Sequence, residues 1–435
     1  MFMEVQKLSH QDIDWDTFSL FEDNEFKIFS EKIKYFFQSE NLYLSEKEIY
    51  TLFGSLISEF ALPKFISGFG KKFIIHNERS FLIHPSLFLV DIVPMFDDKY
   101  WIDLGFFHRH PAFQKTFEKI SSKKIIKLDN YSKKLSLIYF KLLRKILKYG
   151  FFKYGLNLVR RIIFVLANKE ILLRKGKTNI LGSAHGIYTN IGAILLCAAV
   201  RTNGKIILNQ PGFFHLQAKY IYQVKYELNI ATKYIGWGGS EKVTRKRTNI
   251  EDVGSMYTYR LSKNKVCNGG LVLLPQVPRE NYRGFSFYWM SRFDFLNLLP
   301  ELSQAISKLQ KKHKTLILRC KSVDKHFYKS FFNKLKLDVQ FQFADVNQGE
   351  DFDVYEKTYI TYFSTGIVEA FYKGSNVQLI FKPKTYLVKD EVFDYVSFFD
   401  THPTDQKKLG EYLSIFAKPT MPTQFVDRLN NIINS

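Results

Sequence analysis

The chain has 435 residues, 46% hydrophobic and 24% charged, which is enough for two ordinary globular domains and excludes disorder throughout. There are 63 lysines and arginines against 42 acidic residues, and the formal net charge of +21 predicts an anionic partner such as nucleic acid, phospholipid headgroups or a phosphorylated substrate. No helix-turn-helix, RNA-binding sheet or zinc signature accompanies this charge, so nucleic acid is not the favoured partner.

The cysteines and the first residues bear on the cellular compartment. Cys197, Cys267 and Cys320 are far apart, and each lies in or beside an apolar stretch. Their odd number and their spacing argue against disulfides and zinc, so we expect three buried, reduced thiols. Residues 1–20 lack the apolar core of a signal peptide, and no window reaches the roughly 18 apolar residues that cross a bilayer. We therefore expect a cytoplasmic protein.

The first 177 residues carry no recognisable motif. Glu31–Phe60 has helical spacing, and Phe73–Val93 is more strand-like. Residues 117–177 are rich in lysine, arginine and regularly spaced large apolar side chains. Such a basic amphipathic stretch is typical of a helix at an anionic membrane surface, which would hold the protein on the inner face of the plasma membrane. A packed helix with a solvated basic face gives the same pattern.

An α/β pattern follows. We predict strands over 178–182, 205–208 and 233–237, and helices over 191–201 and 216–230. Short connections between them are typical of parallel βαβ units. The polar residues 240–270 are interpreted as a connection between domains.

The pattern then starts again, with predicted strands over 271–274, 315–319, 339–343, 359–362 and 377–381, and helices over 298–311, 330–335 and 367–372. We predict an α/β fold with two doubly wound Rossmann-like domains facing a cleft and a helical basic N-terminal extension. The first domain would span residues 1–265 and the second 266–415. Residues 416–435 would form a C-terminal helix able to pack back on the first domain.

One predicted strand end combines hydroxyls, backbone amides and a carboxylate. Ser364, Thr365 and Gly366 follow a strand and open a helix, with Glu369 one turn further on. In open parallel sheets ligands bind at such loops, where helix-terminal N–H groups attract anions. We predict a nucleotide site here, with Glu369 taking the two ribose hydroxyls. The competing interpretation is a plain helix cap with the glutamate in a capping box.

Two histidines near strand ends of the first domain are candidate catalytic residues. His185 lies directly at a strand end before a glycine, so a substrate could approach it closely, and we favour it as the base. His215 follows the loop that contains Gln210 and Gly212, and Asn190 follows His185. The alternatives are a structural histidine and an ordinary Pro-Gly turn.

Cations follow another strand of the second half. Arg319 and Lys321 could neutralise a phosphate, although a solvated loop gives the same sequence.

Together these segments resemble GT-B-fold glycosyltransferases, particularly bacterial transferases of capsule and lipopolysaccharide synthesis. The resemblance covers roughly residues 178–400. The matching positions are Gln210 to Gly212, Glu227, Lys233 to Gly238, the loop from Leu273 to Arg283, Arg319, and Ser364 and Thr365 with Glu369. The family has a histidine where this chain has Pro211, so His185 or His215 must substitute if a histidine is needed.

The resemblance implies transfer of a sugar from a nucleotide sugar to a surface polysaccharide or lipopolysaccharide precursor, that is, to a glycan or glycolipid acceptor. It places the nucleotide in the second domain, with Arg283 among its ligands. It also implies that Gln210, Gly212 and Asn190 lie on the acceptor side. A CMP-activated acidic sugar is the favoured donor. We expect no metal and no cofactor besides this co-substrate, because the Asp-x-Asp pair at Asp351–Asp353 lies in a predicted surface loop. The alternatives are a CDP-polyol phosphotransferase of the teichoic-acid type and a nucleic-acid-binding protein.

Overall fold

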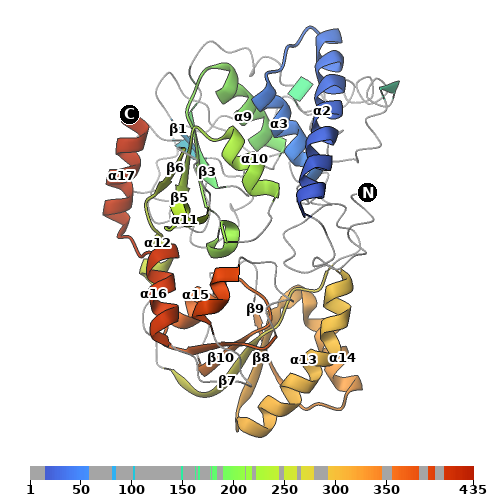
Figure 1. Cartoon of the computed structure of the whole chain (residues 1–435), viewed down its shortest axis with the longest axis vertical. Helices are drawn as coiled ribbons and strands as arrows, with labels where there is room; N and C mark the ends of the chain where they lie inside the picture. The colour runs from blue at the N-terminus through green and yellow to red at the C-terminus, as the bar shows by residue number, and fades with distance from the viewer. Residues whose placement is uncertain are drawn as a thin grey trace.

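The computed structural model describes residues 15–57, 81–84, 101–102, 148–149, 162, 165–166, 177, 179–183, 190–210, 212–217, 222–243, 249–261, 266–278, 292–344, 355–381, 390–396 and 406–435. These residues form two α/β domains, drawn one above the other in Figure 1. The predicted fold of two Rossmann-like α/β domains is confirmed. The basic segment 117–177 lies almost wholly outside the described residues.

The first domain is built on a six-stranded parallel sheet of order β2-β1-β3-β4-β5-β6. Its elements are α2 (Trp15–Ser39), α3 (Glu46–Ile57), β1 (Phe81–His84), β2 (Trp101–Ile102), β3 (Asn179–Ser183), α9 (Asn190–Arg201), β4 (Ile206–Asn209), the 3-10 turn η6 (Phe213–His215), α10 (Tyr222–Ile230), β5 (Lys233–Gly236), α11 (Ser240–Val243), β6 (Ile250–Asp252) and α12 (Met256–Arg260). The helical pattern over Glu31–Phe60 is thus two helices, and Asn41 with φ 55° lies between them.

Both faces of the first sheet are buried, which explains the continuous apolar runs of its central strands. Ile206 and Leu208 pack with residues of α9 and α10 on one face. Ile207 points to the other face, where Phe425 and Leu429 of the C-terminal helix cover it.

The interpretation of residues 240–270 as a plain connection is wrong, because the segment contains α11, β6, α12 and the start of β7. Ile250–Asp252 forms β6, which pairs in parallel with β5 and completes the first sheet. The strand has three partly exposed residues and two acids, so it has no apolar run for a sequence pattern to detect.

The second domain has a five-stranded parallel sheet of order β11-β10-β7-β8-β9. Its elements are β7 (Cys267–Leu273), α13 (Arg292–Lys312), β8 (Leu316–Lys321), η7 (Ser322–Asp324), α14 (Lys325–Lys334), β9 (Gln340–Ala344), β10 (Tyr355–Ile360), α15 (Thr365–Tyr372), β11 (Asn376–Leu379), η9 (Asp390–Tyr395) and α16 (Gln406–Phe416). Helices α13 and α14 lie on one flank of the sheet, and α15 and α16 lie on the other (Figure 1).

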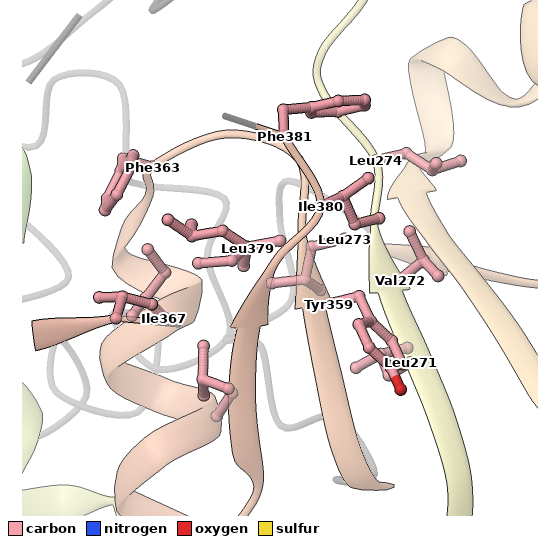
Figure 2. Close-up of a cluster of buried hydrophobic side chains, with 14 of the residues drawn as sticks. Leu271, Val272, Leu273, Leu274, Tyr359, Phe363, Ile367, Leu379, Ile380 and Phe381 are labelled. Carbon is pink, nitrogen blue, oxygen red and sulfur yellow. The ribbon is translucent and has the colours of Figure 1, made fainter. Parts of the chain in front are cut away.

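The core of this domain holds the start of α15 in place. Leu273 of β7, Leu379 of β11 and Ile367 of α15 are buried in one cluster (Figure 2). Phe363, just before the helix, belongs to the same cluster and has almost no exposed surface. The loop that opens α15 is therefore fixed by packing on both sides.

The chain crosses between the domains twice, and the two crossings are hydrogen-bonded to each other. The Ser255 N–H donates to the carbonyl of Lys418 at 2.7 Å, and the Thr420 N–H donates to the carbonyl of Ser255 at 3.1 Å. The second crossing leads from α16 into α17 (Pro422–Asn434), which packs on the first sheet (Figure 1).

Cys197 and Cys320 are buried as expected, whereas Cys267 at the start of β7 is exposed, which corrects the expectation of three buried thiols. Among the described residues, no helix combines the length and the hydropathy needed to cross a membrane.

Candidate active site

The loop before α15 lies at the point where the strand order of the second sheet reverses. From β7 the chain proceeds to β8 and β9 on one side, then returns to place β10 and β11 on the other. Open parallel sheets bind ligands at such a switch point, beyond the carboxyl ends of the strands. Thr361, after β10, donates its hydroxyl to the carbonyl of Leu273 at the end of β7, which ties the two strand ends together.

Ser364 is the N-cap of α15. Its side chain accepts a hydrogen bond from the Gly366 N–H at 3.2 Å, and its carbonyl accepts one from the Ile367 N–H at 3.1 Å. The first turn of α15 contains no acidic residue. The helix start thus keeps the electropositive character of an N-terminus, with the hydroxyls of Ser364 and Thr365 beside it.

Glu369 points into the protein interior. Its side chain is 1% exposed, and Lys373, one turn later, places its Nζ 3.3 Å from Oε1. Tyr257, on α12, donates its phenol to Oε2 at 3.0 Å. The sequence pattern assigned Glu369 to ribose, whereas its described contacts are with these two side chains. It lies too far into the helix to close a capping box with Ser364.

The strand-end loop of the first domain reaches the start of α15. The Phe213 N–H points at the Thr365 Oγ1, 3.4 Å away. A side chain on Gly212 would place its Cβ 3.1 Å from the same oxygen, so a glycine allows the close approach. The structure therefore brings together two loops that the sequence assigned to opposite halves of the site.

Gln210 shapes this loop from inside. Its side chain is fully buried, donates to the carbonyls of Gly212 and Phe213 at 2.9 Å, and accepts from the Trp237 N–H at 2.9 Å. It thereby joins the loops that follow β4 and β5. Because both ends of the amide are engaged within the protein, Gln210 positions the loop that follows β4.

A second contact between the domains, from Tyr257 of α12 to Glu369 of α15, lies beside the first. The indole of Trp237 stacks on the ring of Tyr257, with centroids 6.2 Å apart and planes at 26°. Tyr257 in turn reaches Glu369. We use the name domain junction for Gln210, Phe213, Trp237, Tyr257, Thr365 and Glu369.

His215 is turned into the first domain. Its Nε2 is 3.1 Å from Glu227 Oε2, and Tyr234 donates its phenol to the same oxygen at 3.3 Å. Burial, followed by the charge of Glu227 and the hydrogen bond to it, raises the pKa of Tyr234 well above its usual value. His215 itself is 6% exposed in this arrangement.

The cations of the second domain lie one strand away from the switch point. Lys321, at the end of β8, donates to Gln276 Oε1 at 3.0 Å, which links the ends of β7 and β8. Arg319 is largely buried and reaches Gln342 at 3.4 Å. These two side chains are therefore held by polar contacts at the same edge of the sheet as α15.

Three further candidates stay predictions. His185 and Arg283 lie outside the described residues, and of Asn190 only the backbone position at the start of α9 is described. In the part of the chain that the structure covers, no three His, Cys, Asp or Glu side chains converge as a metal site would require.

Sequence reasoning missed Tyr257 and Lys373. The spacing of Glu369 and Lys373 is visible in the sequence as an i, i+4 pair, the usual spacing of helical ion pairs. Tyr257 leaves no such signal, because its contact with Glu369 spans 112 residues of chain.

No protein-family model and no curated protein matches this chain. Among solved structures, the UDP-GlcNAc 2-epimerase of Methanocaldococcus jannaschii, in complex with UDP-GlcNAc and UDP, is similar at 12% identity and a TM-score of 0.45, over 82% of this chain and 99% of that one. The calicheamicin glycosyltransferase CalG4 is similar at 11% identity and a TM-score of 0.33, over 82% of this chain and 95% of that one.

Proposed function

We propose that the chain is a glycosyltransferase whose second domain binds a nucleotide sugar at the start of α15 and whose first domain presents the acceptor. One observation carries this proposal. The switch-point helix of the second sheet begins against the strand-end loop of the first, with Phe213 N–H and Thr365 Oγ1 3.4 Å apart. A donor phosphate at α15 would therefore lie beside residues of both domains, as transfer between two substrates requires.

The chemistry at the start of α15 suits a phosphate. A helix N-terminus carries a partial positive charge, and the hydroxyls of Ser364 and Thr365 can donate to phosphate oxygens. Arg319 and Lys321 add positive charge at the same edge of the sheet. In this proposal helix dipole and cations stabilise the leaving nucleotide without a metal.

The donor, the acceptor and the location are finer proposals that rest on the sequence resemblance. We propose a CMP-activated acidic sugar as the donor and a surface polysaccharide or lipopolysaccharide precursor as the acceptor. The net charge of +21 supports attachment to the anionic inner face of the plasma membrane. Co-sedimentation with anionic vesicles should weaken as the salt concentration rises. Equal binding to neutral and anionic vesicles would contradict the attachment.

Nucleotide binding followed by transfer tests the function. CMP, CDP and UDP are compared by calorimetry and thermal shift, with a DNA oligomer as the competing class of ligand. At about 100 times its Kd, a bound nucleotide stabilises the fold by about 2.7 kcal/mol. Thr365→Val, which keeps the shape and removes the hydroxyl, should weaken binding. Transfer is then measured with a panel of CMP-sugars. Binding of DNA without any nucleotide would refute the proposal.

A further inference from the structure

Three buried polar side chains anchor η6 inside the first domain. His215 comes from η6 itself, Glu227 from α10 and Tyr234 from β5. Both His215 and Tyr234 approach one oxygen of Glu227, at 3.1 and 3.3 Å. The Glu227 side chain has no exposed surface, so the carboxylate depends on donors from the protein.

Hydrogen-bonding chemistry indicates where the protons lie. A carboxylate oxygen only accepts hydrogen bonds, so the imidazole of His215 must carry a proton on Nε2 to bond with Glu227. The raised pKa of Tyr234 keeps its phenol protonated, so it is the second donor. Both donors therefore reach the same oxygen of Glu227.

The anchored turn is also the one that meets α15. The His215 N–H donates to the Gly212 carbonyl at 3.2 Å, and Phe213 in the same turn directs its N–H at Thr365. A shift of the His215 ring therefore moves the backbone that faces the start of α15.

We propose that Glu227 and Tyr234 are positioning residues that hold His215 with its proton on Nε2 and thereby fix η6 against the first turn of α15. His215 is then the link between the interior of the first domain and the domain junction. The effect on nucleotide affinity rests on the function proposed above, whereas the anchoring of η6 does not.

The protonation is tested in the unmodified protein. Nitrogen-15 spectra of histidine-labelled chain report which ring nitrogen carries a proton, and His215→Gln identifies the His215 signals. We expect a hydrogen-bonded proton on Nε2 of His215. An Nε2 without a proton would mean that Glu227 is the donor, and would overturn the proposal.

Hydrogen exchange tests the anchoring. Glu227→Gln should make the Phe213 amide exchange at least about tenfold faster, because the turn loosens locally. Tyr234→Phe should do so to a smaller degree. Glu251→Gln is the matched control. This carboxylate is 42% exposed, and its contact with Lys233 Nζ is long, at 4.0 Å, so its loss should leave η6 in place. Unchanged exchange of Phe213 in a folded Glu227→Gln protein would refute the anchoring.

A double-mutant cycle on CMP affinity separates positioning from a general loss of structure. Glu227→Gln should weaken CMP binding about tenfold in the wild-type background and less than about twofold in Thr365→Val, since the two residues act through one contact. Equal effects in both backgrounds would overturn the positioning role. If the wild type binds no nucleotide, the proposed function fails, while the spectra and the exchange rates still decide the anchoring.

Discussion

Tyr257 of the first crossing donates its phenol to Glu369 of α15. A buried carboxylate of the second domain thus receives a hydrogen bond from a residue that follows the first sheet. Lys373 balances the charge of the carboxylate, and both members of the ion pair are at most 3% exposed. Because neither charge reaches solvent, the pair and the phenol must be considered together.

Removing Glu369 should therefore affect stability first. Glu369→Ala leaves the Lys373 ammonium buried without its partner, which typically costs about 3–5 kcal/mol of unfolding free energy. Tyr257→Phe removes one hydrogen bond and should cost only about 1 kcal/mol. Urea unfolding of both variants measures the difference. A Glu369→Ala protein of normal stability with weakened nucleotide binding would instead support the ribose role.

The crossing at Gly254 should not tolerate a side chain. Gly254 has φ +99°, and a Cβ there would lie 1.9 Å from Thr420 Oγ1. Gly374→Ala is the matched control, because Gly374 has φ +100° and its nearest neighbour would be 3.5 Å away. The left-handed backbone costs each variant about 1–2 kcal/mol. We expect Gly254→Ala to melt well below Gly374→Ala, and equal melting temperatures would contradict the steric argument.

Acid should weaken the second domain partly through His313. Burial, followed by the charges of Lys357 and Lys312, lowers the pKa of His313 from 6.5. The unfolded chain thus binds a proton before the folded one, so this contribution to stability is present above pH 6.5 and is lost as the pH falls through the lowered pKa. Urea unfolding across this range should show a shallower decline in His313→Gln. Identical pH profiles would show that His313 does not contribute.

The three cysteines should react differently. Cys267 is exposed, whereas Cys197 on α9 and Cys320 on β8 are buried. Burial also raises the pKa of the Cys320 thiol to about 12. Because the thiolate is the reactive form, iodoacetamide should label Cys267 in the native protein. Cys197 and Cys320 should become labelled only after unfolding. Mass spectrometry of peptides identifies the labelled position. Rapid native labelling of Cys320 would contradict the described packing.

Most strands that the sequence predicted are buried apolar runs, and β9 (Gln340–Ala344) is an exception that was predicted although it is partly exposed at a sheet edge. Ile206–Asn209 and Leu316–Lys321 are apolar runs because helices cover both sides of each sheet. Strand β6 was not predicted because it has only three residues, two of them acidic. Its place in the sheet depends on pairing with β5, which no local pattern encodes.

For the candidate site, sequence reasoning located the loops but not the direction of their side chains. Position at a strand end indicated Gln210, His215 and Glu369 as ligand-binding or catalytic residues. Their described contacts lie within the protein, and each includes a partner on another element: Trp237, Glu227 and Tyr257 respectively. Such partners follow from the tertiary fold and leave no spacing to recognise.

Helix α17 has a consequence for the order in which the protein acquires its structure. Residues 422–434 cover the face of the first sheet that contains Leu181, Ile207 and Ile235. During synthesis this apolar face emerges from the ribosome long before the helix that shields it. The second domain, whose strands all precede α17, can assemble meanwhile. The first domain to be translated is therefore the last to be finished, and a chaperone that binds nascent apolar surface would find its target there.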